Sequence, residues 1–224
     1  MTKLKTRPEN NFHCFEGAGL PYWRSIAEGH TPIGDPGLKP GELEPAQGPD
    51  GSWWEFKQDI DGYILQNGGI ALPQETKLNP GIYFRFFGTI THNTRGANGG
   101  MSGGWWIDYE NLAKIQNFAE RSDYSLARAA TMLLIIPKEW HDCGYVGCAQ
   151  LGKQMKAFVG KGSPATGTIS PANAMRDPSR NPVMIGSPYL DMKQYFVPGS
   201  RDEISTAFKC LWTKPVIKPG IRVV

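Results

Sequence analysis

The spacing of hydrophobic and polar positions changes along the chain at about residue 77. Before that point, turn-forming residues separate short apolar pieces, and only residues 22–28 carry a helical pattern. Residues 82–87 are apolar or aromatic at every position except Arg85. This pattern predicts a β-strand with neither face fully exposed, and it places an arginine among aromatic side chains.

Helical spacing follows a glycine-rich segment, residues 95–104, which predicts a loop. Ile107, Leu112, Ile115 and Phe118 then have helical spacing, so a helix is predicted to begin near Asp108. The run Met-Leu-Leu-Ile-Ile at residues 132–136 is followed by a proline and predicts a buried strand.

The last third of the chain reads as strands separated by one long loop. Residues 151–162 predict a short helix or a strand closed by glycines, and residues 163–188 have almost pure loop composition. A strand is predicted at residues 192–197, and one or two more between residues 208 and 224. Together these patterns predict an α+β fold with long loops.

Composition narrows the fold class further. The 224 residues include 27 glycines and 18 prolines, yet 40% are hydrophobic and 11% aromatic. So many aromatic residues argue against disorder, and so many helix breakers argue against a helical bundle. Residues 1–76 carry 6 basic and 11 acidic side chains, whereas the remainder has a net charge of +8. We therefore expect an acidic, turn-rich N-terminal arm or adaptor at residues 1–76 and a main domain at residues 77–224.

Several kinds of site are not predicted. The four cysteines are too scattered for a disulfide framework, so we expect reduced and mostly buried thiols. The four histidines share no metal-ligand spacing, and neither a G-x-S-x-G elbow nor a P-loop is present. No signal-peptide pattern or long apolar run occurs, which predicts a cytoplasmic protein without a membrane partner. The basic main domain suits a phosphate-bearing ligand or nucleic acid, or is simply a solvated surface.

Three features then follow one another along the main domain. Arg85 lies in the first aromatic strand, Ser102 begins a Ser-Gly-Gly-Trp-Trp segment, and Gln194 lies in a late strand after the long loop. A guanidinium pairs bidentately with phosphate oxygens, and aromatic faces next to a glycine-rich backbone can stack on a flat ligand. The expected ligand-binding residues are Arg85, Phe86, Gly103, Trp105, Trp106 and Tyr195.

In this order, over about residues 78–200, the chain resembles the ADP-ribosyltransferase-like toxin domains of bacterial polymorphic and secreted effectors. The resemblance implies a split β-sandwich of two small antiparallel sheets with flanking helices, and NAD as the substrate. It makes Arg85, Ser102 and Gln194 the catalytic residues of the three family motifs. It also implies cleavage of the nicotinamide–ribose bond, transfer of ADP-ribose to a macromolecular target, action in a target-cell cytoplasm, and a cognate immunity protein.

The chain departs from the family pattern at the third motif. A neutral Gln194 replaces the usual glutamate, and Met192 stands where arginine-specific enzymes have Gln or Glu. Arginine modification is therefore in doubt, and NAD(P) hydrolysis with water as acceptor is an alternative, as is a non-enzymatic nucleotide- or partner-binding module on a degenerate fold. Glu110 and Asp191 are candidate substitute carboxylates. Glu110 also fits a first-turn helix residue favoured by the helix dipole, and Asp191 fits a plain loop residue.

Overall fold

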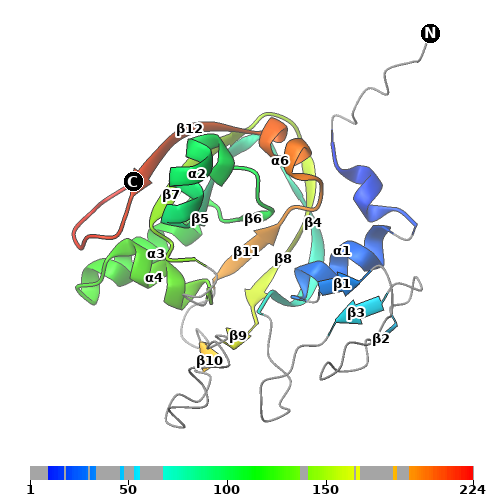
Figure 1. Cartoon of the computed structure of the whole chain (residues 1–224), viewed down its shortest axis with the longest axis horizontal. Coiled ribbons are helices and arrows are strands. Elements are labelled where there is room, and N and C mark those ends of the chain that lie inside the picture. Colours follow the sequence, from blue (N-terminus) through cyan, green and yellow to red (C-terminus); the bar gives the residue numbers. More distant parts are fainter. Residues whose placement is uncertain are drawn as a thin grey trace.

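The structure, a computed structural model, describes residues 10–17, 19–29, 31–33, 46–47, 53–55, 68–136, 141–163, 165–166, 184–185 and 192–223. The main body is a mixed α/β fold on two antiparallel sheets that do not form a barrel (Figure 1). The four-stranded sheet has the order β4 (Ile70–Leu78), β8 (Met155–Gly162), β11 (Lys193–Phe196) and β6 (Trp105–Trp106). The three-stranded sheet has the order β12 (Phe208–Pro215), β7 (Tyr145–Leu151) and β5 (Gly81–Phe87).

One short segment, residues 105–107, forms backbone hydrogen bonds with both sheets. β6 pairs with β11 in the four-stranded sheet, and Ile107, the residue after β6, pairs with Phe84 of β5. The two backbones exchange hydrogen bonds, at 2.8 Å from the Phe84 N–H and 2.9 Å from the Ile107 N–H. Residues 105–107 therefore reach both sheets, and they do so beside Arg85.

The predicted strands at residues 82–87 and 192–197 are confirmed as β5 and β11, and the ambiguous residues 151–162 contain strand β8. In the tail, β12 is present, whereas residues 216–223 contain no second strand. Within residues 163–188, β9 (Ala165–Thr166) pairs with β10 (Met184–Ile185). The rest of that predicted loop lies outside the described residues.

The helix predicted to begin near Asp108 is confirmed as α3 (Tyr109–Arg121). It begins there because the Asp108 carboxylate caps it by accepting from the N–H of Asn111. The prediction of a buried strand at residues 132–136 is wrong. Helix α4 (Leu126–Leu133) begins after the Ser125 cap and ends inside that run. Its alanines favour a helix, and the residues that it buries recur at helical spacing.

The prediction of a loop at residues 95–104 is wrong for residues 95–100. Helix α2 (Thr89–Gly100) occupies them, with a kink at Gly96, where φ is 66°. That conformation suits glycine, so the helix tolerates the break. The remaining helices of the described chain are η1 (Phe12–Phe15), α1 (Gly19–Ala27) and α6 (Arg201–Ala207), and β1 (Thr31–Ile33), β2 (Ala46–Gln47) and β3 (Trp53–Glu55) form a small separate sheet.

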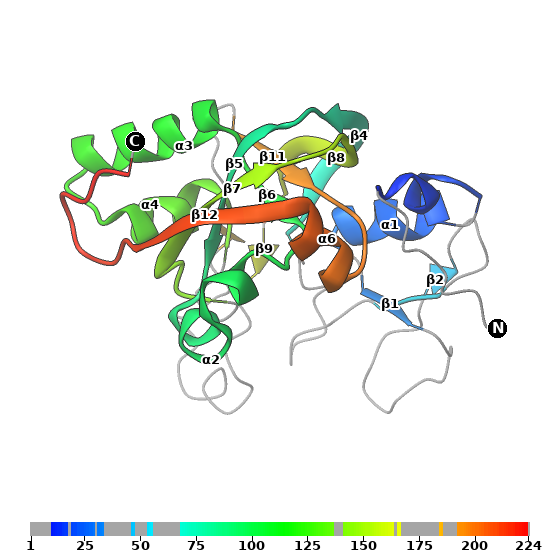
Figure 2. The ribbon, with the colours of Figure 1, turned by 90° about the horizontal axis from the view of Figure 1, so that it is seen from above.

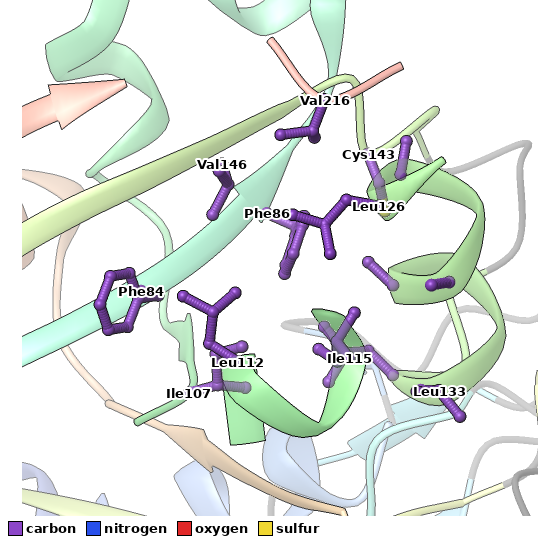
Figure 3. Packing of buried hydrophobic residues seen from close by; sticks show 14 of the residues in the cluster. Phe84, Phe86, Ile107, Leu112, Ile115, Leu126, Leu133, Cys143, Val146 and Val216 are labelled. Atoms are coloured by element: carbon purple, nitrogen blue, oxygen red, sulfur yellow. The ribbon is translucent and has the colours of Figure 1, made fainter. Parts of the chain in front are cut away.

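Helices α3 and α4 cover one face of the three-stranded sheet, on the side away from α1 (Figures 1 and 2). Figure 3 shows Phe84 and Phe86 of β5 packed against Leu112 and Ile115 of α3 and Leu126 of α4. A second cluster, which includes Trp106, Leu151 and Phe208, lies between the sheets. Cys14, Cys143 and Cys148 are buried free thiols, and Cys210 is half-buried. None of the helices in the described part combines the length and apolar character that a membrane crossing needs.

The N-terminal segment, residues 10–17 and 19–29, packs on the main body. Asn11 is fully buried, and its Nδ2 donates to the carbonyls of Lys156 and Pro198, both at 2.8 Å. Its Oδ1 accepts from the Lys156 N–H at 2.9 Å. Helix α1 buries Ala27 against Ile70 and Phe158, so this part of the expected arm shares a core with the four-stranded sheet.

The domain boundary predicted between residues 76 and 77 needs correction. It falls inside β4, which pairs with β8 over its whole length apart from a bulge between Ala71 and Gln74. The change in charge therefore does not mark the edge of the main body, because the sheet begins at Ile70.

Replacing Asn11 with alanine is expected to destabilise the protein by about 2–3 kcal/mol, because three backbone groups lose their buried partner. Urea unfolding measures the change. The exposed Asn93, on α2, gives the matched Asn93→Ala control, for which we expect less than about 0.5 kcal/mol. Equal stability of the two variants would show that Asn11 does not hold the N-terminal segment in place.

Candidate functional site

A cavity of about 90 Å³ lies where the two sheets meet, and we call it the Arg85 cavity. Both sheets contribute to its wall. The lining includes Arg85 and Phe86 from β5, Trp105 and Trp106 from β6, and Gln194 from β11. The wall also contains residues 134–136, which follow α4, and His141. Residues far apart in the sequence are thus brought to one place by the pairing of β6 with β11 and of Ile107 with β5.

Arg85 supplies the positive charge of this cavity. Its Nη1 donates to the Trp105 carbonyl at 3.3 Å, and its Nε is buried without a hydrogen-bond partner in the described structure. Burial, together with the nearby charge of Arg201, lowers the pKa of Arg85 to about 10. The guanidinium is therefore still charged at neutral pH. No carboxylate of the described residues forms an ion pair with it, so the cavity favours an anion.

Gly103 makes room for Arg85. A Cβ atom at Gly103 would overlap the guanidinium carbon and both of its terminal nitrogens. Gly103 was expected to let the backbone approach a ligand, but it does not line the cavity. Its position instead allows the Arg85 side chain to lie against the backbone just before β6.

Gln194 is buried, and its amide has a fixed orientation. The Leu134 carbonyl can only accept a hydrogen bond, so the atom that lies 2.9 Å from it is the donor Nε2. The amide oxygen Oε1 is then left as an acceptor, and no group in the described residues donates to it. Gln194 thus offers the cavity a neutral acceptor, with a partial negative charge.

The aromatic residues differ in how much surface they offer. Trp105 is half-buried and lines the cavity, and its ring centroid lies 5.0 Å from that of Phe196. Trp106 also lines the cavity, but it is 1% exposed and stacks face to face on Phe208 at 3.9 Å. Phe86 is buried in the cluster under α3 and α4 and reaches the lining from there. Trp105 is therefore the best placed of the three for stacking.

Two predicted site residues lie elsewhere. Ser102 does not line the cavity, and its Oγ donates to the Gly99 carbonyl at 2.9 Å at the end of α2. Tyr195 follows Gln194 in β11 and therefore points to the opposite face of the sheet. There its hydroxyl donates to Asp108 Oδ2 at 2.9 Å, and it lines a separate depression beside Lys161 and Lys193.

The substitute carboxylates do not reach the cavity in the described structure. Glu110 is exposed in the first turn of α3 and pairs with Lys114 at 2.8 Å, as its helix position favours. Asp191 lies outside the described residues. None of the described residues that line the cavity is an aspartate or glutamate.

His141 is a cavity residue that the sequence reasoning did not assign to the site. Its Nδ1 accepts from the Cys143 N–H at 3.1 Å, so the neutral ring carries its proton on Nε2. Burial, and then the charge of Arg85, lower the pKa of His141 to about 4, against an opposing effect of Asp142. It is thus neutral at pH 7. No spacing in the sequence pairs His141 with Arg85, and only the fold shows that they share a cavity.

Comparison with known proteins found no matching family model, no matching curated protein and no matching solved structure. Within the described residues, no three His, Cys, Asp or Glu side chains gather so as to hold a metal ion. The chemistry of the site therefore depends on its own groups: a half-buried cation, an oriented amide oxygen, a neutral imidazole and an aromatic wall.

The Gln194→Glu variant tests the orientation of the amide. A carboxylate would meet the Leu134 carbonyl with no proton to donate, and the charge of Arg85 across the cavity offsets only part of that cost, so we expect a loss of about 1–3 kcal/mol at pH 8. Burial and the Leu134 carbonyl raise the pKa of the introduced carboxyl in the folded state, against the opposing effect of Arg85, and its protonated form can donate to Leu134. The loss relative to the unmodified protein should therefore shrink at pH 5, as urea unfolding at both pH values measures.

The control is Gln150→Glu, which adds the same charge at an exposed position of β7. It should change stability by less than about 0.5 kcal/mol at either pH. If Gln194→Glu behaved in the same way, the Gln194 side chain would not be held by Leu134.

Proposed function

We propose that the protein binds NAD with its nicotinamide end in the Arg85 cavity and cleaves the nicotinamide–ribose bond. The main support for this proposal is that Arg85 and Gln194 come from different sheets and line one cavity together with Trp105. Two antiparallel sheets with a cavity at their junction are compatible with an ADP-ribosyltransferase-like split β-sandwich, which is the fold that we propose. The biological role that goes with it is that of a bacterial effector toxin acting in a target-cell cytoplasm, with a cognate immunity protein as partner.

The size of the cavity limits what enters it. Pockets that enclose a drug-sized ligand begin at about 300 Å³, whereas this one measures about 90 Å³. A single aromatic ring fits such a volume better than a whole dinucleotide does. We therefore place the nicotinamide inside, against Trp105, with the ribose and pyrophosphate at its mouth.

The charges in the cavity suit the bond that breaks. When the bond between ribose C1′ and nicotinamide breaks, its electron pair leaves with the ring nitrogen, and the ribose becomes an oxocarbenium-like cation. Arg85, without a carboxylate partner, is available to a pyrophosphate oxygen. Oε1 of Gln194 can accept from a ribose hydroxyl and place partial negative charge near the developing cation.

The acceptor of the ADP-ribose group then adds to C1′ and loses a proton. Transfer to a macromolecular acceptor remains the broader family activity. The lack of a carboxylate among the described lining residues favours hydrolysis as the second candidate. Water attacks a strong electrophile such as an oxocarbenium ion with little help from a base, whereas a protein nucleophile more often needs one.

Incubation with NAD, alone and with cell lysate, tests the proposal by following nicotinamide release. Arg85→Met should lower the rate by about 100-fold, the usual effect of losing a charge-assisted contact to the reacting ligand. Gly103→Ala should also lower it, because the added methyl group displaces the guanidinium without changing Arg85 itself. Gly152→Ala, where a Cβ atom meets nothing within 4 Å, is the matched control and should keep full activity.

The outcomes separate the candidate functions. Release in buffer alone supports hydrolysis, and release only with lysate supports transfer to a macromolecular acceptor. NAD binding without release under either condition would leave the non-enzymatic nucleotide-binding module. Neither binding nor release would reject the site as an NAD site.

A further inference from the structure

His141 and Arg85 line the cavity as a pair of hydrogen-bond donors. Arg85 comes from β5, and His141 lies just before β7. The Cβ atom of His141 is so close to Gly88, the residue after β5, that a Cβ atom on Gly88 would be only 2.8 Å from it. Because Nδ1 of His141 accepts from Cys143, Nε2 is the donor, and none of the described residues accepts from it. A guanidinium and an imidazole N–H that both lack a carboxylate partner are complementary to an anionic oxygen.

We propose that Nε2 of His141 is a second donor to the phosphate group that Arg85 binds, and that phosphate binding brings a proton onto His141. The inference rests on the proposed function only in that it takes a ligand whose phosphate lies at the mouth of the Arg85 cavity, where Arg85 and His141 are both partly exposed. It assigns His141 as a phosphate-binding residue whose protonation is linked to occupancy of the site.

The charges that act on His141 explain the linkage. Arg85 opposes protonation of the ring, while Asp142 favours it. Partial burial acts to raise the pKa of Asp142, but the hydrogen bonds that its Oδ1 accepts from the N–H groups of Thr89 and Gly144 outweigh it, so the pKa is lowered and the carboxylate stays charged. The neighbouring Cys143 thiol is neutral, since burial raises its pKa to about 12. Arg201 acts on Arg85 and adds to the positive potential.

A bound phosphate reverses the largest electrostatic cause. In the free protein, burial and the Arg85 charge hold the pKa of His141 at about 4. An anion placed between the two side chains offsets the charge of Arg85 and pairs with the imidazolium, so the pKa of His141 rises in the complex. The complex then carries more protons than the free protein between the two pKa values. Affinity must therefore increase as the pH falls from 7 towards 5, by at most tenfold per pH unit.

Titration calorimetry with ADP-ribose tests this inference separately from catalysis. ADP-ribose keeps the pyrophosphate and lacks the nicotinamide, and its phosphates stay fully ionised between pH 5 and 8. Binding is measured across that range in buffers that differ in ionisation enthalpy, which gives the number of protons taken up. For the unmodified protein we expect an affinity about tenfold higher at pH 5 than at pH 7, which corresponds to uptake of about half a proton per site at pH 6 and about 0.8 at pH 5.

Two substitutions divide the two functions of the ring. His141→Asn keeps an acceptor for the Cys143 N–H but removes the Nε2 donor, so it should abolish proton uptake and lower affinity about tenfold at pH 6. His141→Gln places an amide donor near the former Nε2 but cannot titrate, so it should keep much of the affinity at pH 7 without proton uptake. His92→Gln is the control, because His92 stacks on Tyr145 outside the cavity, and it should behave like the unmodified protein.

The results distinguish this inference from the proposed function. Proton-linked binding of ADP-ribose that disappears in His141→Asn supports the inference even if NAD is not cleaved. Affinity independent of pH, proton uptake unchanged in His141→Asn, or no binding of ADP-ribose would overturn it, even if NAD is cleaved.

Discussion

The reciprocal backbone hydrogen bonds between Phe84 and Ile107 are the interaction on which the site depends. They attach the chain that leaves β6 to β5, while β6 itself pairs with β11. Three consecutive residues therefore join the two sheets, and the side chain next to Phe84 is Arg85. This junction holds the edge strand that carries Arg85 beside the sheet that carries Gln194, so that the two side chains line one cavity. The fold thus places the cation and the amide together through main-chain pairing, which depends little on the side chains involved.

Arg85 at this junction has a cost in stability. Its guanidinium is enclosed with one backbone acceptor at 3.3 Å, an unpaired Nε, and no carboxylate partner in the described structure. A half-buried charge with so few partners is unfavourable, and its lowered pKa has the same origin. Gly103 accommodates Arg85, because only a residue without a side chain leaves the space that the guanidinium occupies. Such an unpaired cation is typical of a binding site rather than of a structural core.

Much of the fold followed from periodicity, but the composition of the site did not. β5, α3 and β11 have strong patterns or a clear cap, whereas the apolar run at residues 132–136 hid the end of α4 because an apolar run fits a buried strand or helix equally well. The alternation along β11 already separates Gln194 from Tyr195, so strand geometry alone argues against both lining one cavity. His141 had no such signal, since its place beside Arg85 depends on how β5 and β7 pair.

The identity of residue 194 connects the local structure to the proposed chemistry. The Leu134 carbonyl requires a donor, and an amide supplies one while leaving Oε1 for the cavity, which an ionised glutamate cannot do. With Gln194 and His141 both neutral, Arg85 is the only charged group in the described lining at pH 7. An oxocarbenium ion beside an unpaired guanidinium would be repelled. On the proposed function, the pyrophosphate of the substrate therefore supplies the missing negative charge, and the bound ligand completes the electrostatics of the site that cleaves it.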